Sequence, residues 1–484
     1  MPALRSEAGP GFSEVFAGAE VRPHYRQLVE LLDNLGADEL ADRAKILDAI
    51  FRDLGITFAI GEEGVERTWP MDLVPRIIPA DEWTGLEAGL IQRVTALNRF
   101  LDDLYVGEQA ALNDGIVPRW LVESSDGYQR EAHGISVPRA ARCVVAGIDL
   151  VRDEDGTYRV LEDNLRVPSG ISYVLENRAA MTRVLPAAFG EHEVRPVNHY
   201  GNSLLSALRS IAPAGTGDPT VVVLTPGVFN SAYFEHAFLA RQMGAELVEG
   251  RDLLVEDQVV YMRTTRGLEQ VHVIYRRIND EFLDPVAFRS NSFLGVPGLM
   301  GAARAGTVTI ANAVGNGAAD DKAVYAFVPD LIRYYLGEEA LINNVTTYLL
   351  WDADQRQQVL DRLDRLVIKP VAESGGYGIV IGEQASDSQL EDLRRLINAY
   401  PRNYIAQEVV RLSTHPTLVS GHLQERHIDL RPFVLSGEHV EVIPGGLTRV
   451  ALREGSLIVN SSQGGGSKDT WVLREEPVGA IAAR

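Results

Sequence analysis

Cysteine is almost absent from this sequence of 484 residues, which contains only Cys143. A single cysteine excludes an internal disulfide and a cysteine-rich metal site. Long apolar runs are absent too, since none approaches the roughly 20 residues that span a bilayer. The first residues also lack the charged-then-apolar pattern of a secretion signal. These absences predict a cytoplasmic protein without a membrane partner, with Cys143 packed in an apolar strand of the core.

Positive charge is scarce, because 46 lysines and arginines stand against 67 acidic residues and give a formal net charge of −21. Binding to duplex nucleic acid needs a basic surface, so this balance argues against a nucleic-acid partner but leaves local phosphate sites open. Lysine is especially rare and occurs only as Lys45, Lys322, Lys369 and Lys468. A lysine kept in an arginine-rich chain indicates a place where a compact point charge is needed. Codon bias explains the arginine excess, but not why three of the four lysines lie within or beside motifs.

The length and the 45% apolar content predict a globular chain of two to four domains. Apolar residues at helical spacing over 25–51 and 83–105 predict a mostly helical region over 1–130. Strands and helices alternate over 220–310, which predicts a small α/β domain with parallel strands. The fold class expected is α/β (α+β). The expected domain limits are 1–130, 131–200, 201–315 and 316–484.

The first candidate motif is a strand over 367–371 that carries Lys369 and leads into the glycine-rich segment Ser374, Gly375, Gly376, Tyr377 and Gly378. Glycines let the backbone approach phosphate oxygens closely and form an anion-binding nest. The lysine precedes the glycines, so this is not a P-loop. An ordinary glycine turn after a strand is the alternative interpretation.

Two further residue patterns are weaker indications of a binding site. The strand expected over 404–410 carries Gln407 and Glu408, which could meet an adenine edge and ribose hydroxyls, although polar residues commonly end strands. Lys322 opens a helix expected over 321–336, directly after two acidic residues that suit the positive end of the helix dipole.

The segment 143–165 reads as a β-hairpin with Asp155-Gly156 as its turn. Glu162 and Asn164 are two residues apart on a strand and therefore share a face. A two-residue turn would place Asp149 directly opposite Glu162. Two carboxylates and an amide oxygen on one face are suited to Mg²⁺, whereas the alternative is a solvated polar face.

These residues belong to long stretches that together resemble the circularly permuted ATP-grasp proteins, a family similar to the synthetase domain of glutathionylspermidine synthase. The stretches are GIDLVRD, VLEDNLRVPSG, LTPGVFNSAYFEHAFLAR, YRRIND, LGVPGL, ANAVGNGAADDKAVYAFVPDLIRYYLGEE, VIKPVAESGGYGIVIG and NSSQGGGSKDTW. The resemblance implies an ATP-grasp fold with an N-terminal helical region and an inserted small α/β domain like the pre-ATP-grasp domain. The permutation explains why the metal ligands precede the lysines.

The resemblance also implies residue roles. Asp149, Glu162 and Asn164 fall at the positions of magnesium ligands, and Lys322 and Lys369 at those of two ATP-contacting lysines. Residues 374–378 match a loop that covers the phosphates, and Gln407 and Glu408 match the strand along the adenine.

One departure concerns an arginine that the synthetase carries two residues before its metal-binding aspartate, where this chain has Gly147. Arg142, Arg166 or the pair Arg276-Arg277 are candidates to supply that charge. Arg431 is a further candidate catalytic arginine, since it alternates with Asp429 on a strand, and Arg449 could line the same cleft. A surface or interdomain ion pair is the alternative interpretation of these residues. The segment 230–236 opens a helix after a strand, which is typical of substrate contacts or of simple helix capping.

The activity implied is that of an ATP- and Mg²⁺-dependent ligase. It would join a small-molecule or peptide carboxylate to an amine through an acyl phosphate and release ADP and phosphate. The alternatives are an ATP-dependent kinase and a catalytically silent ATP-binding subunit. No thiol amidase domain fits the sequence, so spermidine and glutathione are not implied as substrates, and a homo-oligomer stays possible.

Overall fold

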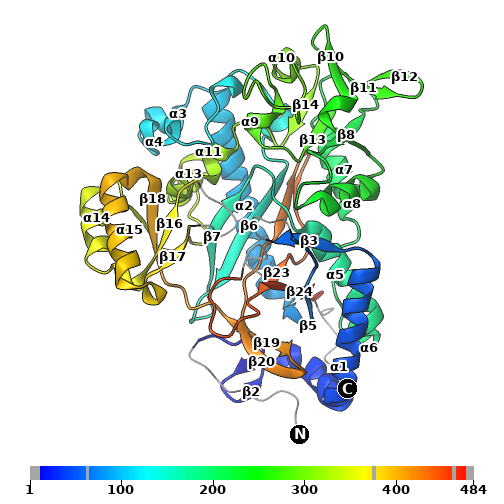
Figure 1. Cartoon of the computed structure of the whole chain (residues 1–484), viewed down its shortest axis with the longest axis vertical. Helices are drawn as coiled ribbons and strands as arrows, with labels where there is room; N and C mark the ends of the chain where they lie inside the picture. Colours follow the sequence, from blue (N-terminus) through cyan, green and yellow to red (C-terminus); the bar gives the residue numbers. More distant parts are fainter. Residues whose placement is uncertain (1–10, 61–64, 373–377, 460–464, 476–484) are drawn as a thin grey trace.

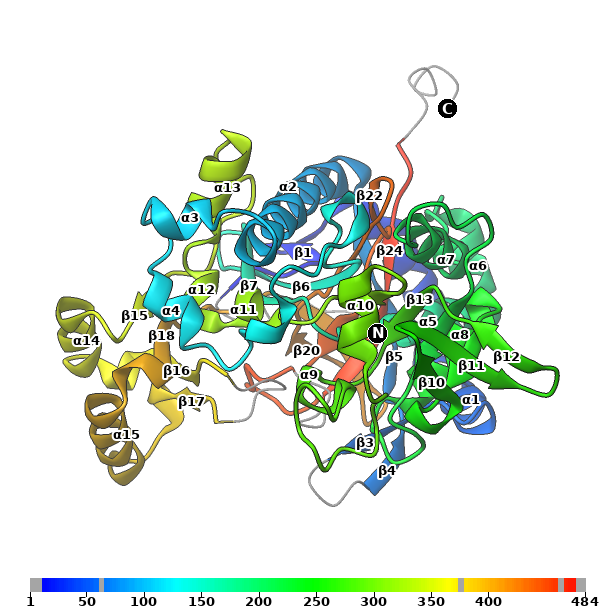
Figure 2. The same ribbon diagram turned by 90° about the horizontal axis from the view of Figure 1, so that it is seen from above.

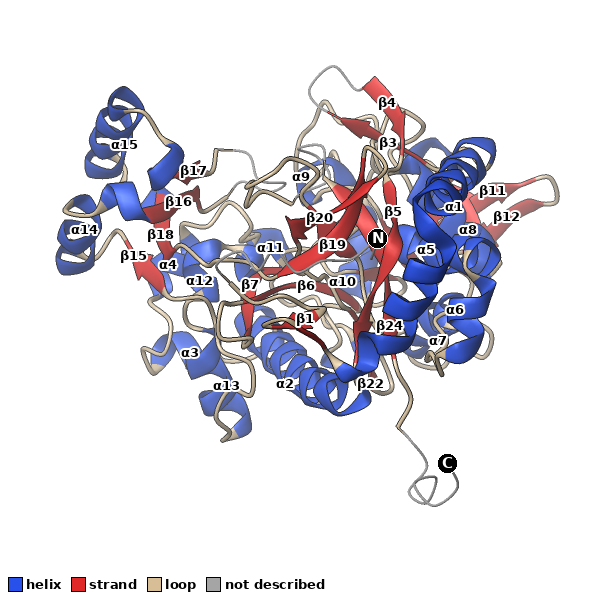
Figure 3. Ribbon diagram, turned by 90° about the horizontal axis from the view of Figure 1, so that it is seen from below, coloured by secondary structure: helices blue, strands red, loops and turns tan. Residues whose placement is uncertain are grey.

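The computed structural model describes residues 11–60, 65–372, 378–459 and 465–475, and shows a mixture of helices and small sheets (Figure 1). Within these residues, no helix combines the length and the apolar character needed to cross a membrane. Figure 3 separates the helices from the strands and shows helices flanking several small sheets.

Two long helices dominate the N-terminal region, as the spacing of apolar residues predicts. They are α1 (Arg26–Asp53) and α2 (Ala80–Tyr105). In α2 the buried side chains recur at helical spacing, as with Trp83, Leu86, Leu90, Leu97 and Leu101, so one face packs into the core. Gly36 has a φ of 75° and interrupts α1.

The chain between these helices forms a strand that was not predicted, because Pro70, Pro75 and Pro79 punctuate this stretch of the sequence. The eight residues of β5 (Met71–Ile78) are all buried, and β5 pairs in parallel with β24 (Gly466–Val472) near the other end of the chain. The sheet order is β23-β24-β5, with β23 at Thr448–Val450, so β5 is an edge strand. A proline such as Pro75 is tolerated there because one side of an edge strand has no ladder to break.

A four-stranded sheet in the order β22-β21-β6-β7 lies near the centre of the molecule. The predicted hairpin supplies β6 (Val145–Arg152) and β7 (Tyr158–Asn164), which are antiparallel. Strands β21 (Phe433–Ser436) and β22 (Val440–Val442) come from far along the chain. Apolar side chains of β6, β7 and β21 share a core with α2, which fixes the hairpin rigidly.

The predicted small α/β domain has a parallel sheet in the order β14-β13-β8-β9, with strands at Val221–Leu224 (β8), Glu246–Val248 (β9), Val273–Arg276 (β13) and Thr309–Ala311 (β14). Helices α7 (Tyr200–Ser210), α8 (Tyr233–Met243) and α10 (Leu299–Ala305) accompany it. An antiparallel three-stranded sheet, absent from the sequence prediction, is inserted at Leu253–Glu256 (β10), Val259–Thr264 (β11) and Gly267–Gln270 (β12).

A separate lobe lies at the far left of Figures 1 and 2, beyond β7. Its sheet has the order β15-β18-β16-β17, with strands at Thr347–Leu349 (β15), Leu366–Pro370 (β16), Val380–Ile381 (β17) and Tyr404–Glu408 (β18). Helices α14 (Ala353–Leu360) and α15 (Asp387–Ala399) cover it and share a small core with it. Ser386 and Gln389 form a capping box that starts α15.

The remaining helices and strands complete the fold. They are β1 (Phe16–Ala17), β2 (Glu20–Val21), β3 (Thr57–Ile60), β4 (Val65–Thr68), α3 (Ala110–Asn113), α4 (Arg119–Glu123), α5 (Ile171–Val184), α6 (Pro186–Glu191), α9 (Asp280–Leu283), α11 (Gly317–Asp320), α12 (Lys322–Tyr325), α13 (Val328–Leu336), β19 (Thr414–Val419) and β20 (His422–His427). The helix expected over 321–336 is thus divided into α12 and α13. The expected domain limits stay predictions.

Candidate functional site

A cavity of about 900 Å³, partly open to solvent, lies between the lobe and the central sheet. It is lined by Asp149, Val151, Leu161, Glu162, Lys322, Val367, Lys369, Pro370, Ile379, Ile381, Gln407, Glu408, Val409, Val410, Leu412, Asp429, Leu457, Ile458 and Val459. Most of these side chains are aliphatic, and the charged ones include two of the four lysines. An apolar cavity with a few polar groups is the usual form of a small-molecule site.

Strand β18 brings Gln407 and Glu408 to the apolar part of the cavity. Gln407 is 1% exposed and donates from Nε2 to Thr347 Oγ1 at 3.0 Å, while its Oε1 is buried without a hydrogen-bond partner. Glu408 accepts a hydrogen bond from the Tyr348 hydroxyl at 2.7 Å and lies 3.0 Å from Arg362. A buried acceptor without a donor is costly, so a ligand donor at Gln407 would satisfy it.

Lys369 enters the cavity from β16 and is 6% exposed. Burial lowers the pKa of Lys369 to about 8, with nearby Lys322 acting in the same direction and Glu162 opposing it. Lys322 lies 3.7 Å from Glu162 Oε2, so the lysine from α12 and the carboxylate from β7 meet at this end of the cavity. The arrangement offers a concentrated positive charge to an anionic ligand.

This shifted pKa predicts a pH dependence. Only the protonated amine attracts phosphate, so the affinity for Mg-ATP, the ligand that the family resemblance implies, should fall as pH rises through the Lys369 pKa of about 8. We expect binding at pH 9 to be about tenfold weaker than at pH 7, measured by titration calorimetry. A Lys369→Met chain should lack this step, and an unchanged affinity in the native chain would contradict the assignment.

The same group affects stability with a definite sign. The folded-state pKa of Lys369, about 8, lies below the ordinary value of 10.5. Between these two values the unfolded chain holds more protons, so the free energy of unfolding contributed by this group increases with pH.

The hairpin presents Asp149 and Glu162 at directly opposed positions, as predicted. Asp149 accepts hydrogen bonds from Arg431 at 2.5 and 2.8 Å and from Arg449 at 2.6 Å. Burial would raise the pKa of Asp149, but these two guanidinium groups outweigh it and hold the pKa below its usual range. Arg449 also binds Asp429, whose pKa is raised by burial. The result is a buried network of two carboxylates and two arginines beside the lysines.

Glu162 and Asn164 have fewer close polar partners than Asp149. Glu162 has Lys322 and Arg431 at 3.7 and 3.9 Å, and among the described residues no hydrogen bond reaches its oxygens. The Asn164 side-chain nitrogen is buried and unpartnered. Amide oxygen and nitrogen are readily interchanged, so a flipped Asn164 would offer its oxygen in the same place.

These three residues fit a magnesium ion by the chemistry of their donors. Asp149 Oδ1 accepts one hydrogen bond and keeps a second lone pair, whereas Oδ2 accepts from both arginines. Hard oxygen ligands are what Mg²⁺ prefers. Within residues 11–60, 65–372, 378–459 and 465–475, no group of three or more histidines, cysteines, aspartates or glutamates is close enough to form a metal site by itself. A bound ion would therefore need further ligands, such as water and phosphate.

A second cavity of about 460 Å³ shares Glu162 and Lys322 with the first. Asn164 and Arg166 line it, and Arg166 Nε donates to Asp320 Oδ2 at 2.7 Å. Arg166 is one-third exposed there, so its terminal nitrogens remain accessible. Of the candidate arginines, the structure brings Arg166 into one cavity with Asn164, and both Arg431 and Arg449 bind Asp149.

Arg142 lies elsewhere. It is 1% exposed, and its terminal nitrogens donate to the carbonyls of Ile135 and Val314. It lines neither of the two cavities described above. Arg276 likewise donates to the carbonyls of Asn312 and Ile278. Both arginines join segments of backbone.

Arg277 pairs with Glu235, which belongs to the predicted substrate segment 230–236. Glu235 accepts hydrogen bonds from Gly170 and Ser172, so this residue secures the start of α5. Cys143 is fully buried, as expected, but it lies just before β6 and not within a strand. Ser374, Gly375, Gly376 and Tyr377 lie outside the described residues, and Gly378 alone of that loop is placed, with a φ of 69° beside Pro370.

The space above Gly147 is filled by Arg431. A Cβ at Gly147 would lie 3.4 Å from Arg431 Cδ and 3.0 Å from Pro168 Cβ. Arg431 thus crosses the face of β6 where the resemblance implies an arginine, and it reaches Asp149 from the neighbouring segment. Sequence reasoning named Arg431 as a candidate but did not connect it with Gly147, because the two are joined only by long-range pairing.

Sequence reasoning missed the apolar wall of the cavity. Leu161, Val410, Leu412 and the segment 457–459 form it, together with Ile379 and Ile381. These residues come from four separated stretches, and aliphatic residues in such stretches carry no signal of a binding role.

The comparisons agree with this geometry. A family model described as circularly permuted ATP-grasp type 2 matches residues 75–451. An uncharacterized protein of Mycobacterium tuberculosis is 56% identical over 475 residues, which cover 98% of this chain and 85% of that protein. A protein of Frankia casuarinae named "Putative glutamate--cysteine ligase 2-2" is 48% identical over 467 residues, which cover 96% of this chain but only 54% of that protein.

A solved structure with a similar fold is that of a glutathione synthetase-like effector from Globodera pallida. It has a TM-score of 0.59 and 13% identity, and the match covers 90% of this chain and 98% of that one. At this identity the likeness concerns the fold alone. Together the two findings confirm the ATP-grasp fold class expected from the sequence, and the chain belongs to the circularly permuted ATP-grasp family, type 2.

Proposed function

We propose that this protein is an ATP-dependent ligase that joins a carboxylate to an amine and releases ADP and phosphate. One observation carries the proposal. A single cavity combines an apolar wall with an unsatisfied acceptor on Gln407 at β18, and two lysines beside the Glu162 carboxylate at its charged end. A nucleotide has the matching polarity, with a flat base at one end and a polyanion at the other.

Each part of the cavity has a role in this proposal. The aliphatic wall and Gln407 bind the adenine, and Glu408 accepts hydrogen bonds from ribose hydroxyls. Lys369 and Lys322 neutralise phosphate charge, which is the main requirement of phosphoryl transfer. Asp149, Glu162 and Asn164 would hold Mg²⁺, which supplies further charge neutralisation at the phosphates when bound.

The reaction proposed has two steps. An oxygen of the substrate carboxylate attacks the γ-phosphorus, the bond to the β-phosphate oxygen breaks, and ADP leaves. The amine then attacks the acyl carbon, phosphate leaves with the bonding electrons, and the nitrogen loses a proton. We assign Arg166 and Arg431 to binding the carboxylate or the transferred phosphate, since guanidinium groups match both in geometry.

The relatives support a ligase without fixing its substrates. The Frankia protein is named for a reaction that joins an amino-acid carboxylate to an amine, but this chain spans about half of it. We propose amino acids or short peptides as the carboxylate class, and a cytoplasmic location. A homo-oligomer stays a proposal.

Hydroxylamine tests the activity directly, because it captures an acyl phosphate as a stable hydroxamate. We expect hydroxamate and ADP to accumulate together when the protein, Mg-ATP and hydroxylamine are incubated with a panel of amino acids and peptides. ADP formed with a phosphorylated product and no hydroxamate would favour a kinase. Nucleotide binding without ADP release across the panel would favour a silent subunit.

A further inference from the structure

Residues 11–22, called the N-terminal arm below, run along β19 and the end of the hairpin. Ser13 pairs with Thr414 in parallel, through Thr414 N donating to Phe12 O at 2.9 Å and Glu14 N donating to Thr414 O at 3.0 Å. Phe12 lies between the guanidinium groups of Arg22 and Arg152, at 4.2 and 4.1 Å from its ring centroid. The arm is therefore fixed to residues of the central sheet, although it precedes the 75–451 segment that defines the family.

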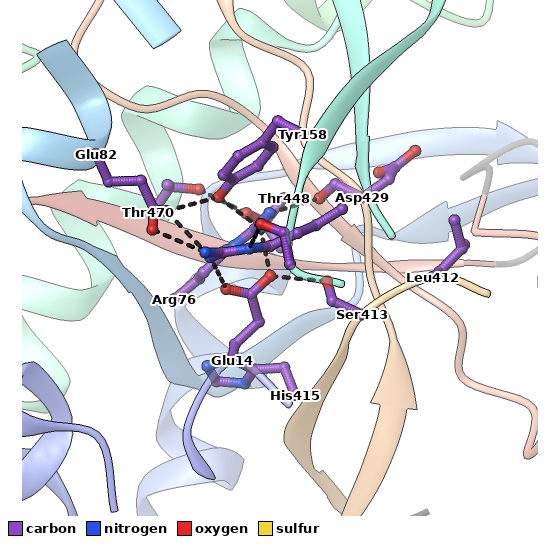
Figure 4. Close-up of polar contacts among 12 residues, drawn as sticks. Glu14, Arg76, Glu82, Tyr158, Leu412, Ser413, His415, Asp429, Thr448 and Thr470 are labelled. Carbon is purple, nitrogen blue, oxygen red and sulfur yellow. Dashed lines mark hydrogen bonds and ion pairs between the residues drawn. The ribbon is translucent and has the colours of Figure 1, made fainter. Parts of the chain in front are cut away.

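The arm inserts one carboxylate into the interior (Figure 4). Glu14 is 2% exposed, and its oxygens accept hydrogen bonds from Arg76 at 2.6 Å, Ser413 at 2.7 Å and Arg152 at 3.0 Å. Burial would raise the pKa of Glu14, but Arg76 and Arg152 lower it, so the group is an anion. Its three donors come from β5, from the end of β6 and from the segment that follows β18.

Through Ser413, Glu14 holds the wall of the nucleotide cavity. Ser413 is fully buried and directly follows Leu412, which lines the cavity with Val409 and Val410. The Ser413 amide also donates to Arg152 O at 2.9 Å. The segment 409–413 has no strand pairing, so such contacts hold its apolar side chains in place. Two further hydrogen bonds join its main chain to residues 427–428 at the end of β20, from the Ile428 amide to Ser413 O at 3.0 Å and between Leu412 O and the His427 ring at 2.9 Å.

Through Arg76, Glu14 also reaches the charged end of the cavity. Arg76 donates to the main-chain oxygen of Asp429 at 3.3 Å, and the Asp429 side chain lines the cavity and binds Arg449. Arg449 in turn binds Asp149. Glu14 is thus the common anchor for the apolar wall and for the residue that holds a proposed metal ligand.

From these contacts we infer that the N-terminal arm is a positioning element of the nucleotide site, with Glu14 as its principal residue. The inference rests on the proposed function and adds a residue that does not touch the nucleotide. The apolar wall is proposed to contact the adenine equally before and during the reaction. Loss of the Glu14 contacts should therefore weaken nucleotide binding more than it slows the chemical step.

The test uses the full-length chain with three substitutions. Ser413→Ala removes one hydrogen bond to Glu14 and leaves the Arg76 pair intact. Glu14→Gln keeps the shape but removes the charge between two arginines, and Glu20→Gln makes the same change at an exposed position of the same arm. Thermal unfolding shows that each variant is folded, and titration with ADP and with a non-hydrolysable ATP analogue, both with Mg²⁺, measures affinity.

We expect Ser413→Ala to weaken nucleotide affinity by about three- to tenfold, and Glu14→Gln by more, while Glu20→Gln matches the native chain. The KM for ATP should rise in the same order, with kcat within about twofold for Ser413→Ala. If folded Ser413→Ala and Glu14→Gln both bind nucleotide with native affinity, the positioning role of Glu14 is wrong, while the proposed function still stands. A native chain that binds no nucleotide would overturn both.

Discussion

Replacing Lys369 by alanine should lower ATP turnover at least about 100-fold and weaken nucleotide binding severalfold. Lys369 is the most buried lysine of the cavity, at 6% exposure, and it lines the cavity in which phosphate is proposed to bind. The protein should stay folded, because an isolated buried ammonium is costly and its removal relieves that cost. Release of ADP in a coupled assay measures the effect, and circular dichroism establishes that the variant is folded.

Lys45→Ala is the matched control for this substitution. Lys45 is highly exposed and pairs with Asp42 on α1, three residues before it. Since the chain has only four lysines, this control separates loss of one particular ammonium from loss of positive charge in general. Normal ATP turnover by a folded Lys369→Ala chain would show that the nucleotide site has been assigned wrongly.

Replacing Glu162 by glutamine should lower kcat by about 100-fold or more and raise the Mg²⁺ concentration needed for half-maximal activity. Glu162 is the cleanest test of the proposed metal ligands, because its contacts are the two ion pairs to Lys322 and Arg431 at 3.7 and 3.9 Å. Asp149, by contrast, is held by two arginines, and its loss would leave buried charges unpaired and destabilise the fold. A Mg²⁺ titration of ADP release measures both effects.

Glu154→Gln is the corresponding control. Glu154 belongs to the loop of the same hairpin and is exposed, with only a distant pair to Arg411 at 3.9 Å. It should leave the Mg²⁺ requirement unchanged. If Glu162→Gln also leaves it unchanged, the metal does not bind at this hairpin.

The hairpin shows what local sequence can and cannot predict. Its existence and the pairing of Asp149 with Glu162 were predictable from alternation and a turn signal. The turn itself was predicted wrongly. The loop spans the five residues 153–157 and is not a two-residue turn. Asp153 stabilises it by accepting hydrogen bonds from the amides of Asp155 and Thr157. A β-bulge between Asp149 and Leu150 then restores the predicted register. No local sequence pattern predicts such a bulge, because neighbouring strands and packing determine it.

The arginines show a different limit. Arg142 and Arg431 are equally plausible in the sequence, since each lies close to a strand and each is always charged. The fold separates them, because Arg142 meets backbone carbonyls while Arg431 meets Asp149. Which arginine faces the site depends on the pairing of Leu150 with Leu430, a contact between segments far apart in the chain. A single sequence does not show which of its distant segments pair in the fold.

The N-terminal region was predicted partly. The two long helices follow directly from their apolar spacing, whereas β5 was hidden by its prolines. Its parallel partner β24 lies near the other end of the chain. A strand such as β5 can be recognised only when its partner is known, because its burial and pairing stabilise it and its local β-propensity does not.

The pairing of early strands with late ones also constrains when the molecule can assemble during synthesis. A nascent chain released from the ribosome as far as β18 would already contain both cavity lysines and the hairpin carboxylates. It would still lack β21, which completes the sheet beside β6, and β24, which pairs with β5. Arg431 and Arg449 would be missing as well, so Asp149 would have no counter-charge. Contacts so distant along the chain form slowly. The charged end of the cavity is therefore completed only after the segment 431–449 has been synthesised, and a chain truncated before β24 would leave β5 without its parallel partner.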